Sequence, residues 1–372
     1  MKRTLKMMLI GFLVFATLSS IGIVYFLKRP EFGKLPSGPF LARIEKSQNF
    51  KETALDNLNY TPGLTEGVSY AYVMLGFLFS KKERTKPTRA LPSRKTNLLE
   101  LGPDEEVLVW FGHSSYFMQM DGNTFLVDPV FSGSASPFPG GTQSFIGSDI
   151  YGPEDLPMID YLFITHDHWD HLDYKTILAI KPKVKRILCG LGTESHLAYW
   201  GYNPEIIVSM DWYDQWSDTE VQIHSTPARH FSGRGLKRNK TLWTSFVLQT
   251  SGKKIFIGGD SGYDTHFATI GEAHGPFDLA ILENGQYDAN WKYIHMMPEE
   301  VLMAAKDLKA KGLLPVHSSK FALGNHPWDE PIKRISALNE QDEQRLITPM
   351  IGEKVMINDT LQVFEKWWVG ID

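Results

Sequence analysis

Residues 161–173 read YLFITHDHWDHLD, and this stretch decides how the rest of the chain is interpreted. It opens with an apolar, β-branched run typical of a buried strand, followed by six residues that hold three histidines and two aspartates. Because alternate residues of an extended loop project to the same side, His166 and His168 can bind one metal ion. Asp170 and His171 then turn towards a second position. Imidazole and carboxylate ligands suit zinc, with iron or manganese as alternatives, and a solvated loop that is merely rich in histidine is the competing interpretation.

Composition and charge narrow the class of protein. The 372 residues are 42% hydrophobic, which is enough for a sizeable core in one large domain or two ordinary ones. The one cysteine, Cys189, excludes an intrachain disulfide and is expected to be a small buried side chain. The net charge is −5, and the first 29 residues carry five basic and no acidic residues, so the remainder carries −10. Because nucleic-acid binders normally present a basic face, we expect no nucleic-acid partner.

The N-terminus predicts a membrane anchor over residues 1–29. The run from Met7 to Leu27 is uncharged, and at about 1.5 Å per residue it can cross a hydrocarbon core of about 30 Å. A cleaved signal peptide is the alternative, because Ser20-Ile-Gly22 resembles a cleavage site. We predict an uncleaved, single-pass anchor, because the apolar run continues beyond that site. Three basic side chains and the α-amino group precede the span and three basic residues follow it, which favours a catalytic domain outside the cytoplasm.

Two further regions follow the anchor. Residues 30–102 are broken by Pro and Gly and are predicted to form an irregular segment that packs on the main domain, which we expect over residues 103–372. The main domain contains two strand-rich series, each trailed by helices. The expected strands are 107–111, 115–119, 124–127, 161–165, 186–189, 221–225, 242–248, 254–257, 279–282 and 313–316, and the expected helices are 174–180, 194–200 and 298–308. This order predicts an α/β fold of two sheets packed face to face with helices outside, a four-layer αββα sandwich.

Three later strands repeat the theme of the first motif. Each predicted strand delivers one potential metal ligand just past its C-terminal end: His230, Asp260 and His317. The glycines beside Asp260 allow close approach of the backbone. Taken singly, a histidine or aspartate at a strand end is more often part of a hydrogen-bonded turn than a ligand. Four strand ends that carry compatible ligands indicate one shared site.

In this order the motifs resemble the metallo-β-lactamase superfamily. Within it the chain is most similar to N-acyl-phosphatidylethanolamine-hydrolysing phospholipase D and its bacterial relatives, and more distantly to ascorbate-phosphate lactonases. The resemblance spans roughly Glu106 to Pro331, and Asp167 and the polar run 283–287 depart from the phospholipase pattern. The supporting motifs are His166-x-His168-x-Asp170-His171, Trp110-Phe-Gly-His113-Ser, Phe125-Leu-Val-Asp128-Pro, Gly259-Asp260-Ser-Gly-Tyr263, Lys292-Tyr-Ile-His295 and Val316-His317-Ser-Ser.

The resemblance implies a site with two Zn²⁺ ions. It assigns His166, His168 and His230 to one ion, it assigns Asp170, His171 and His317 to the other, and Asp260 bridges them. Two cations about 3.5–4 Å apart would share a water, lower its pKa and present hydroxide as the nucleophile. Asp170 and Asp260 would thereby take part in catalysis.

Four further residues receive roles on the same basis. His295 would position the substrate or protonate the leaving group, and a structural histidine at a helix entry is the alternative. His113, Asp128 and Asp173 would orient the metal ligands from behind, although each could instead satisfy a turn.

The sequence therefore predicts a membrane-anchored, dinuclear zinc hydrolase. A phosphodiester, and in particular a phospholipid, is the leading substrate for a phospholipase D-like reaction. A lactone or other cyclic-ester hydrolase is the second hypothesis. A metal-binding sensor or scaffold that has lost turnover is the third, since a fold does not by itself determine function.

Overall fold

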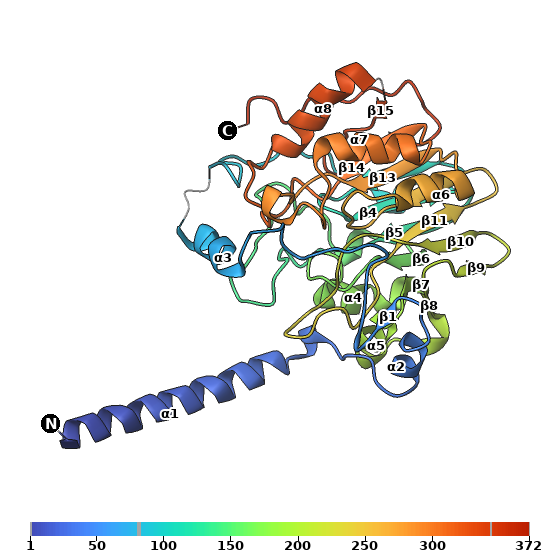
Figure 1. Ribbon diagram of the computed structural model, residues 1–372. Coiled ribbons are helices and arrows are strands. Elements are labelled where there is room, and N and C mark those ends of the chain that lie inside the picture. The colour runs from blue at the N-terminus through green and yellow to red at the C-terminus, as the bar shows by residue number, and fades with distance from the viewer. Residues whose placement is uncertain (1, 80–82, 343, 372) are drawn as a thin grey trace.

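The computed structural model describes residues 2–79, 83–342 and 344–371, so the outer limits of the expected anchor and main domain, Met1 and Asp372, lie outside it. Its centre is a pair of sheets of seven strands each (Figure 1). In spatial order the first sheet contains β16 (Lys354–Met356), β3 (Val107–Trp110), β4 (Tyr116–Met120), β5 (Asn123–Val127), β6 (Ile159–Ile164), β7 (Val184–Gly190) and β8 (Ile207–Met210). The second contains β15 (Arg345–Leu346), β14 (Gly312–Val316), β13 (Leu279–Glu283), β12 (Lys254–Ile257), β11 (Ser245–Gln249), β10 (Gln222–Thr226) and β9 (Gln215–Ser217).

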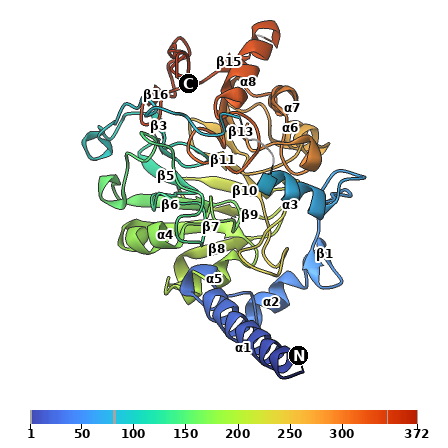
Figure 2. The same ribbon diagram turned by 90° about the vertical axis from the view of Figure 1, so that its left-hand side faces the viewer.

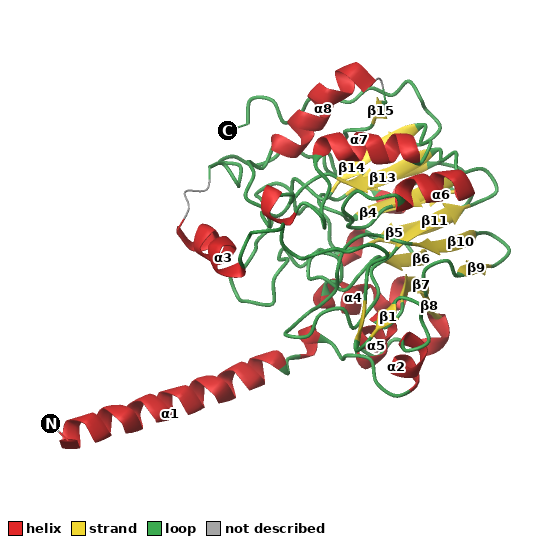
Figure 3. Cartoon of the chain, viewed as in Figure 1, coloured by secondary structure: helices red, strands yellow, loops and turns green. Residues whose placement is uncertain are grey.

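The predicted four-layer αββα sandwich is confirmed. The inner faces of the two sheets form one apolar core, in which the rings of Phe163 and Phe246 meet with centroids 5.2 Å apart. Two helices, α4 (Tyr174–Ile180) and α5 (Thr193–Tyr199), pack on the outer face of the first sheet. The outer face of the second is covered by α6 (His266–His274), α7 (Pro298–Asp307) and α8 (Glu330–Asp342) (Figure 3). Strands covered on both faces must be largely apolar, which explains why β3, β14 and β13 up to Leu282 are continuous apolar, buried runs.

The sequence located the central strands to within a few residues and missed the short ones. The expected strand 242–248 begins only at Ser245, because the backbone N–H groups of Leu242 and Thr244 donate to Leu191 O and Thr165 O of the first sheet. This crossing segment joins the two sheets next to the ends of β6 and β7. All four edge strands of the two sheets (β8, β9, β15 and β16) and the helices α6 and α8 are absent from the expected elements. Of these strands, β15 and β16 pair with strands far away in the chain, whereas β9 pairs with its neighbour β10.

The N-terminal helix α1 (Lys2–Leu27) extends away from the body of the molecule (Figures 1 and 2). Within it, Arg3–Leu27 contains an 18-residue window with a mean hydropathy of 2.3 and is long and apolar enough to cross a membrane, a test that a signal sequence also passes. The segment expected to be irregular contains α2 (Pro39–Ile44), a hairpin of β1 (Phe50–Lys51) and β2 (Ala54–Leu55), and α3 (Tyr70–Phe79). In α3 the side chains of Tyr70, Tyr72, Met74, Leu75 and Phe79 are exposed.

Candidate metal centre

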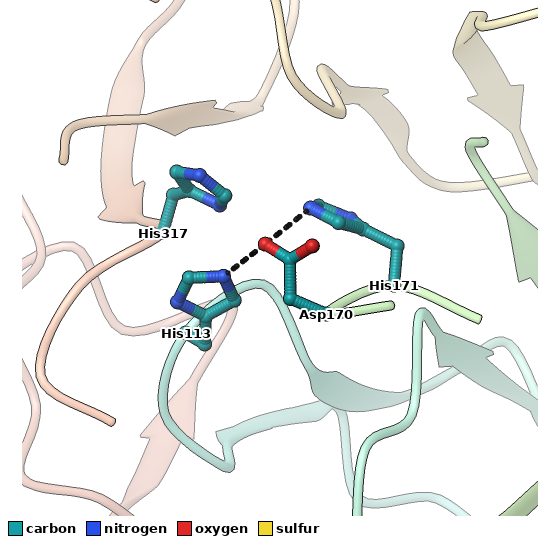
Figure 4. Close-up of side chains that lie close together, drawn as sticks. All are labelled: His113, Asp170, His171 and His317. Carbon is teal, nitrogen blue, oxygen red and sulfur yellow. Dashed lines mark hydrogen bonds and ion pairs between the residues drawn. The ribbon is translucent and has the colours of Figure 1, made fainter. Parts of the chain in front are cut away.

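Polar side chains from four strand ends meet at one edge of the paired sheets. The loop after β6 supplies His166, His168, Asp170 and His171, and the chain after β10, β12 and β14 supplies His230, Asp260 and His317. Carboxyl ends of parallel strands share an edge of a sheet, and the two sheets face each other, so residues more than 140 positions apart become neighbours. Figure 4 shows His113, Asp170, His171 and His317 pointing toward one another.

The seven expected ligands fall into two groups joined by one carboxylate. In the first group, His168 Nδ1 lies 2.9 Å from His166 Nε2 and 3.2 Å from His230 Nε2, so three ring nitrogens converge. In the second, Asp170, His171 and His317 offer ligand atoms within 4.8 Å of one another, together with His113. Asp260 lies between the groups.

The two carboxylate oxygens of Asp260 face different groups. Oδ1 lies 3.2 Å from both His171 Nε2 and His317 Nδ1, whereas Oδ2 lies 3.7 Å from His230 Nε2 and 3.9 Å from His166 Nε2. One oxygen is thus presented to each cluster of imidazoles, which is the placement that a bridging carboxylate requires.

The donor set fits divalent metal ions. The buried atoms His171 Nε2 and Asp260 Oδ1 make no hydrogen bond within the part of the chain that the structure describes. A buried polar atom without a partner is costly, unless it serves a ligand. Imidazole nitrogens and carboxylate oxygens suit zinc and also iron or manganese, so these residues support divalent metals without selecting one.

Partners behind the ligands hold them in place. His171 Nδ1 lies 2.8 Å from Asp128 Oδ2, and Asp170 Oδ2 lies 2.7 Å from His113 Nε2. Asp128 also accepts hydrogen bonds from the N–H and hydroxyl of Thr165, so it joins the end of β6 to the metal loop. His113 and Asp128 are therefore placed where groups that orient ligands must lie.

Asp173 requires a correction. We expected it to orient a ligand, but it is the N-cap of α4 and accepts hydrogen bonds from the Lys175 N–H and the Thr176 hydroxyl. It also accepts the Ser132 N–H, which holds the loop after β5 against this helix. An aspartate just before a helix satisfies otherwise unpaired N–H groups, and here that local role prevailed.

His295 lies beside the centre and has a partner that the sequence analysis missed. Its Nδ1 is 2.6 Å from Glu283 Oε2, and the other oxygen of Glu283 accepts the Met296 N–H at 2.8 Å. Burial lowers the pKa of His295, but the carboxylate of Glu283, together with those of Asp260 and Asp170, more than offsets burial and raises that pKa to about 9. Burial raises the pKa of Glu283 to about 7. The sequence carries a signal for this residue, because Glu283 stands at the end of β13, as the expected ligands follow the ends of their strands.

Glu283 and His295 form a further group with Asp260 and His317, and the ligand atoms of this group lie within 4.8 Å of one another. His295 could therefore itself bind metal. A cavity of about 390 Å³ opens above the centre and is reached by His168, Asp170, His230, Asp260, His295 and His317. Its remaining wall is mainly apolar and includes Tyr70 and Val73 of α3, Trp291, Ile294 and Leu323. The cavity lining thus combines charged and ligating groups with apolar side chains, as in many sites for amphipathic molecules, and Arg238 and Gln286 also reach it.

Comparison with known proteins agrees with this description. The family model described as the Beta-lactamase superfamily domain matches residues 123–318. An uncharacterized protein of Mycobacterium tuberculosis is 34% identical over 338 residues, which cover 87% of this chain and 88% of that protein.

Two relatives carry descriptive names. The N-acyl-phosphatidylethanolamine-hydrolyzing phospholipase D 1 of Caenorhabditis elegans is 28% identical over 268 residues, 66% of this chain and 74% of that protein. Among solved structures, the diiron β-hydroxylase CmlA of Streptomyces venezuelae matches with a TM-score of 0.51 and 20% identity, and covers 69% of this chain and 55% of that one. The last match demonstrates a shared fold alone.

Proposed function

This chain belongs to the β-lactamase superfamily and is a metal-dependent hydrolase, and we propose that it cleaves phosphodiesters in the manner of a phospholipase D with two zinc ions. The observation that carries the dinuclear proposal is Asp260, which presents one oxygen to each of two imidazole clusters. We assign His166, His168 and His230 to one position, and we assign Asp170, His171 and His317 to the other. When bound, the metal ions would supply Lewis acidity and acidify water.

The residues of the chain then divide the remaining work. Asp260 would offset repulsion between two bound cations and help to set their spacing, and Asp170 would add a second negative charge beside them. His295 faces the cavity, and its bond to Glu283 leaves Nε2 to bind the substrate or to give a proton to the leaving oxygen. We assign these roles to Asp260, Asp170 and His295 from their positions, since all three side chains reach the cavity.

The cavity supports a phospholipid as the substrate. A cavity that is lined by both apolar side chains and charged, ligating groups suits a molecule that has a charged phosphodiester and long hydrocarbon chains. Similarity to the phospholipase D of Caenorhabditis elegans points in the same direction.

We further propose that α1 is an uncleaved membrane anchor and that the hydrolase domain lies outside the cytoplasm. The apolar surface of α1 is exposed along the length of the helix. Such a surface is stable in lipid and costly in water. The excess of positive charge before the span supports this orientation.

The proposed activity is tested with purified, zinc-reconstituted protein and a panel of phosphodiesters, phospholipids and lactones. We expect hydrolysis of phospholipids at the bond that releases phosphatidic acid, and two metal ions per chain by elemental analysis. Cleavage of lactones alone would establish the cyclic-ester hypothesis instead. Two bound metals with no turnover on any class would favour a sensor or scaffold, and clearly fewer than two after reconstitution would contradict the dinuclear site.

A further inference from the structure

A buried arginine behind the metal loop connects it to the segment that follows α1. Arg234 is only 3% exposed. Its Nη1 donates to Asp167 O at 2.8 Å and to Leu172 O at 2.7 Å, two carbonyls of the metal loop. Its Nε and Nη2 donate to Glu31 O at 3.1 and 2.8 Å. The guanidinium therefore holds two segments together that lie more than 130 residues apart in the chain.

A second connection runs through the side chain of Asp167, which stands between the histidines His166 and His168. One oxygen of Asp167 accepts the Gly233 N–H at 2.7 Å, and the other lies 3.2 Å from His196 Nε2. His196 Nδ1 accepts the Lys34 N–H at 3.0 Å, so the proton of a neutral His196 is on Nε2 and points at Asp167. Asp167, which departs from the phospholipase pattern, thus ends a chain of hydrogen bonds that begins at the Lys34 N–H and passes through His196.

Packing presses the same segment against the loop. The ring of Phe32 meets that of Trp169 edge-on with centroids 5.1 Å apart, and the Arg234 guanidinium lies 4.0 Å from the centre of the Trp169 ring. Pro30 O accepts the indole N–H of Trp200 at 2.8 Å. At Gly33 there is no room for a side chain, since a Cβ atom would lie 2.1 Å from His196 Nδ1.

We propose that residues 30–34 are the rear support of the metal-binding loop, with Arg234, Asp167 and His196 as the positioning residues that join the two. This proposal rests on the assignment of His166 and His168 as ligands in the proposed function. A buried guanidinium that loses its carbonyl partners is left uncompensated, so the loop and residues 30–34 must hold their positions together. The metal centre thereby depends on the first residues after the proposed anchor, and a change at the membrane-proximal end of the chain reaches the ligands without any contact to them.

Two glycines that follow α1, one inside residues 30–34 and one beyond them, provide a matched test in the full-length protein. Gly33 and Gly38 have similar backbone angles, with φ of 69° and 56° and ψ of −159° and −130°, so alanine causes comparable backbone strain at either position. Only at Gly33 does the new methyl group collide with His196, because nothing lies within 4 Å of a Cβ atom at Gly38. For Gly33→Ala we expect metal affinity, measured by chelator competition, to fall about tenfold or more. Gly38→Ala should keep the affinity within about twofold of wild type, because it leaves the support of the ligands intact.

A second pair of variants probes Arg234 itself. Arg234→Met removes the donors but fills the space, and Arg234→Lys should restore part of the metal affinity because it returns a cationic donor. Lys183→Met is the control, since Lys183 also donates to chain carbonyls, Pro153 O and Leu156 O, at a place that contacts none of the proposed ligands. The visible absorption spectrum of the cobalt-substituted protein reports ligand geometry, which a loss of general stability would leave unchanged. We expect altered spectra for Gly33→Ala and Arg234→Met and unaltered spectra for both controls.

The proposal would be overturned if Gly33→Ala and Arg234→Met both fold and both keep the wild-type metal affinity and cobalt spectrum. Equal losses in Gly33→Ala and Gly38→Ala would also overturn it, because backbone strain would then account for the effect. These measurements use metal and chelator alone, so they stand whether or not the substrate is a phosphodiester. Wild-type protein that binds no metal would instead contradict the proposed function.

Discussion

The two halves of the proposed metal centre are supported in different ways. The second position is backed by buried ionisable side chains, with Asp128 on His171 and His113 on Asp170. The first is backed by uncharged groups, since His230 Nδ1 lies 2.9 Å from Ile294 O and His166 Nδ1 lies 3.1 Å from the Thr165 hydroxyl.

The two halves also differ in charge. The first position has three neutral imidazoles and one oxygen of Asp260, whereas the second has a carboxylate ligand of its own and another carboxylate behind His171. A carboxylate behind a histidine raises its basicity as a ligand. We therefore expect the second position to bind metal more tightly, and the first to depend on Asp260.

The largest expected effect tests that dependence. Asp260→Asn keeps the size of the side chain but removes its charge, so the metal at the first position should bind poorly while the second is retained. We expect turnover to fall by orders of magnitude, because stabilisation of the transition state is lost more than substrate binding. Metal stoichiometry and turnover are measured on the same preparation. Full occupancy with a near-normal rate would show that Asp260 does not bridge, and loss of the second metal would reverse the ranking of the two positions.

His295→Ala separates the substrate side of the cavity from both metal positions. We expect two metals to remain and the rate to fall about 10²- to 10⁴-fold, the usual range for loss of a general acid or base. Elemental analysis and steady-state kinetics on any substrate found provide the measurement. If this variant loses a metal, His295 is a ligand, in the group that it forms with Asp260, Glu283 and His317.

His113→Asn addresses the support of the second position alone. Asparagine tolerates the positive φ of 54° at this residue but is too short to keep the bond to Asp170. Affinity of the second position should fall about 10- to 100-fold while the first is unchanged, as titration with cobalt can resolve. Equal weakening of both positions would remove the distinction between the halves, and abolished binding at the second would make His113 a ligand.

The smallest effect on the centre is expected from deletion of residues 1–29. This removes α1 but leaves residues 30–34 and their bonds to Arg234 and His196, so the protein should be soluble and bind two metals with unchanged affinity. Sedimentation with membranes and elemental analysis compare the shortened and full-length proteins. If the full-length chain is already processed and soluble in cells, α1 is a signal peptide.

Much of the centre could be predicted because its ligands follow a local rule. Most follow an apolar run that had to become a buried strand, whereas His230 follows the mixed strand β10, and strand ends gather at one edge of a sheet. Seven residues in four such places, with the right chemistry, therefore indicated the site before any distance was known. The apolar span of α1 was equally legible, because composition and length alone define it.

Tertiary structure decided the relations that no local pattern encodes. Asp128 and Asp173 look alike in the sequence, yet one lies behind a ligand and the other caps a helix. Glu283 is placed by its contact with His295, twelve residues further along the chain. Arg234 is placed by its hydrogen bond to Glu31 O, near the N-terminal end of the chain. The sequence by itself determined the central strands, the candidate ligands that follow them and the apolar span, since neighbouring residues determine periodicity and polarity. Which buried polar groups pair could be decided only by folding, because each pair depends on the distance between segments that the chain brings together from afar.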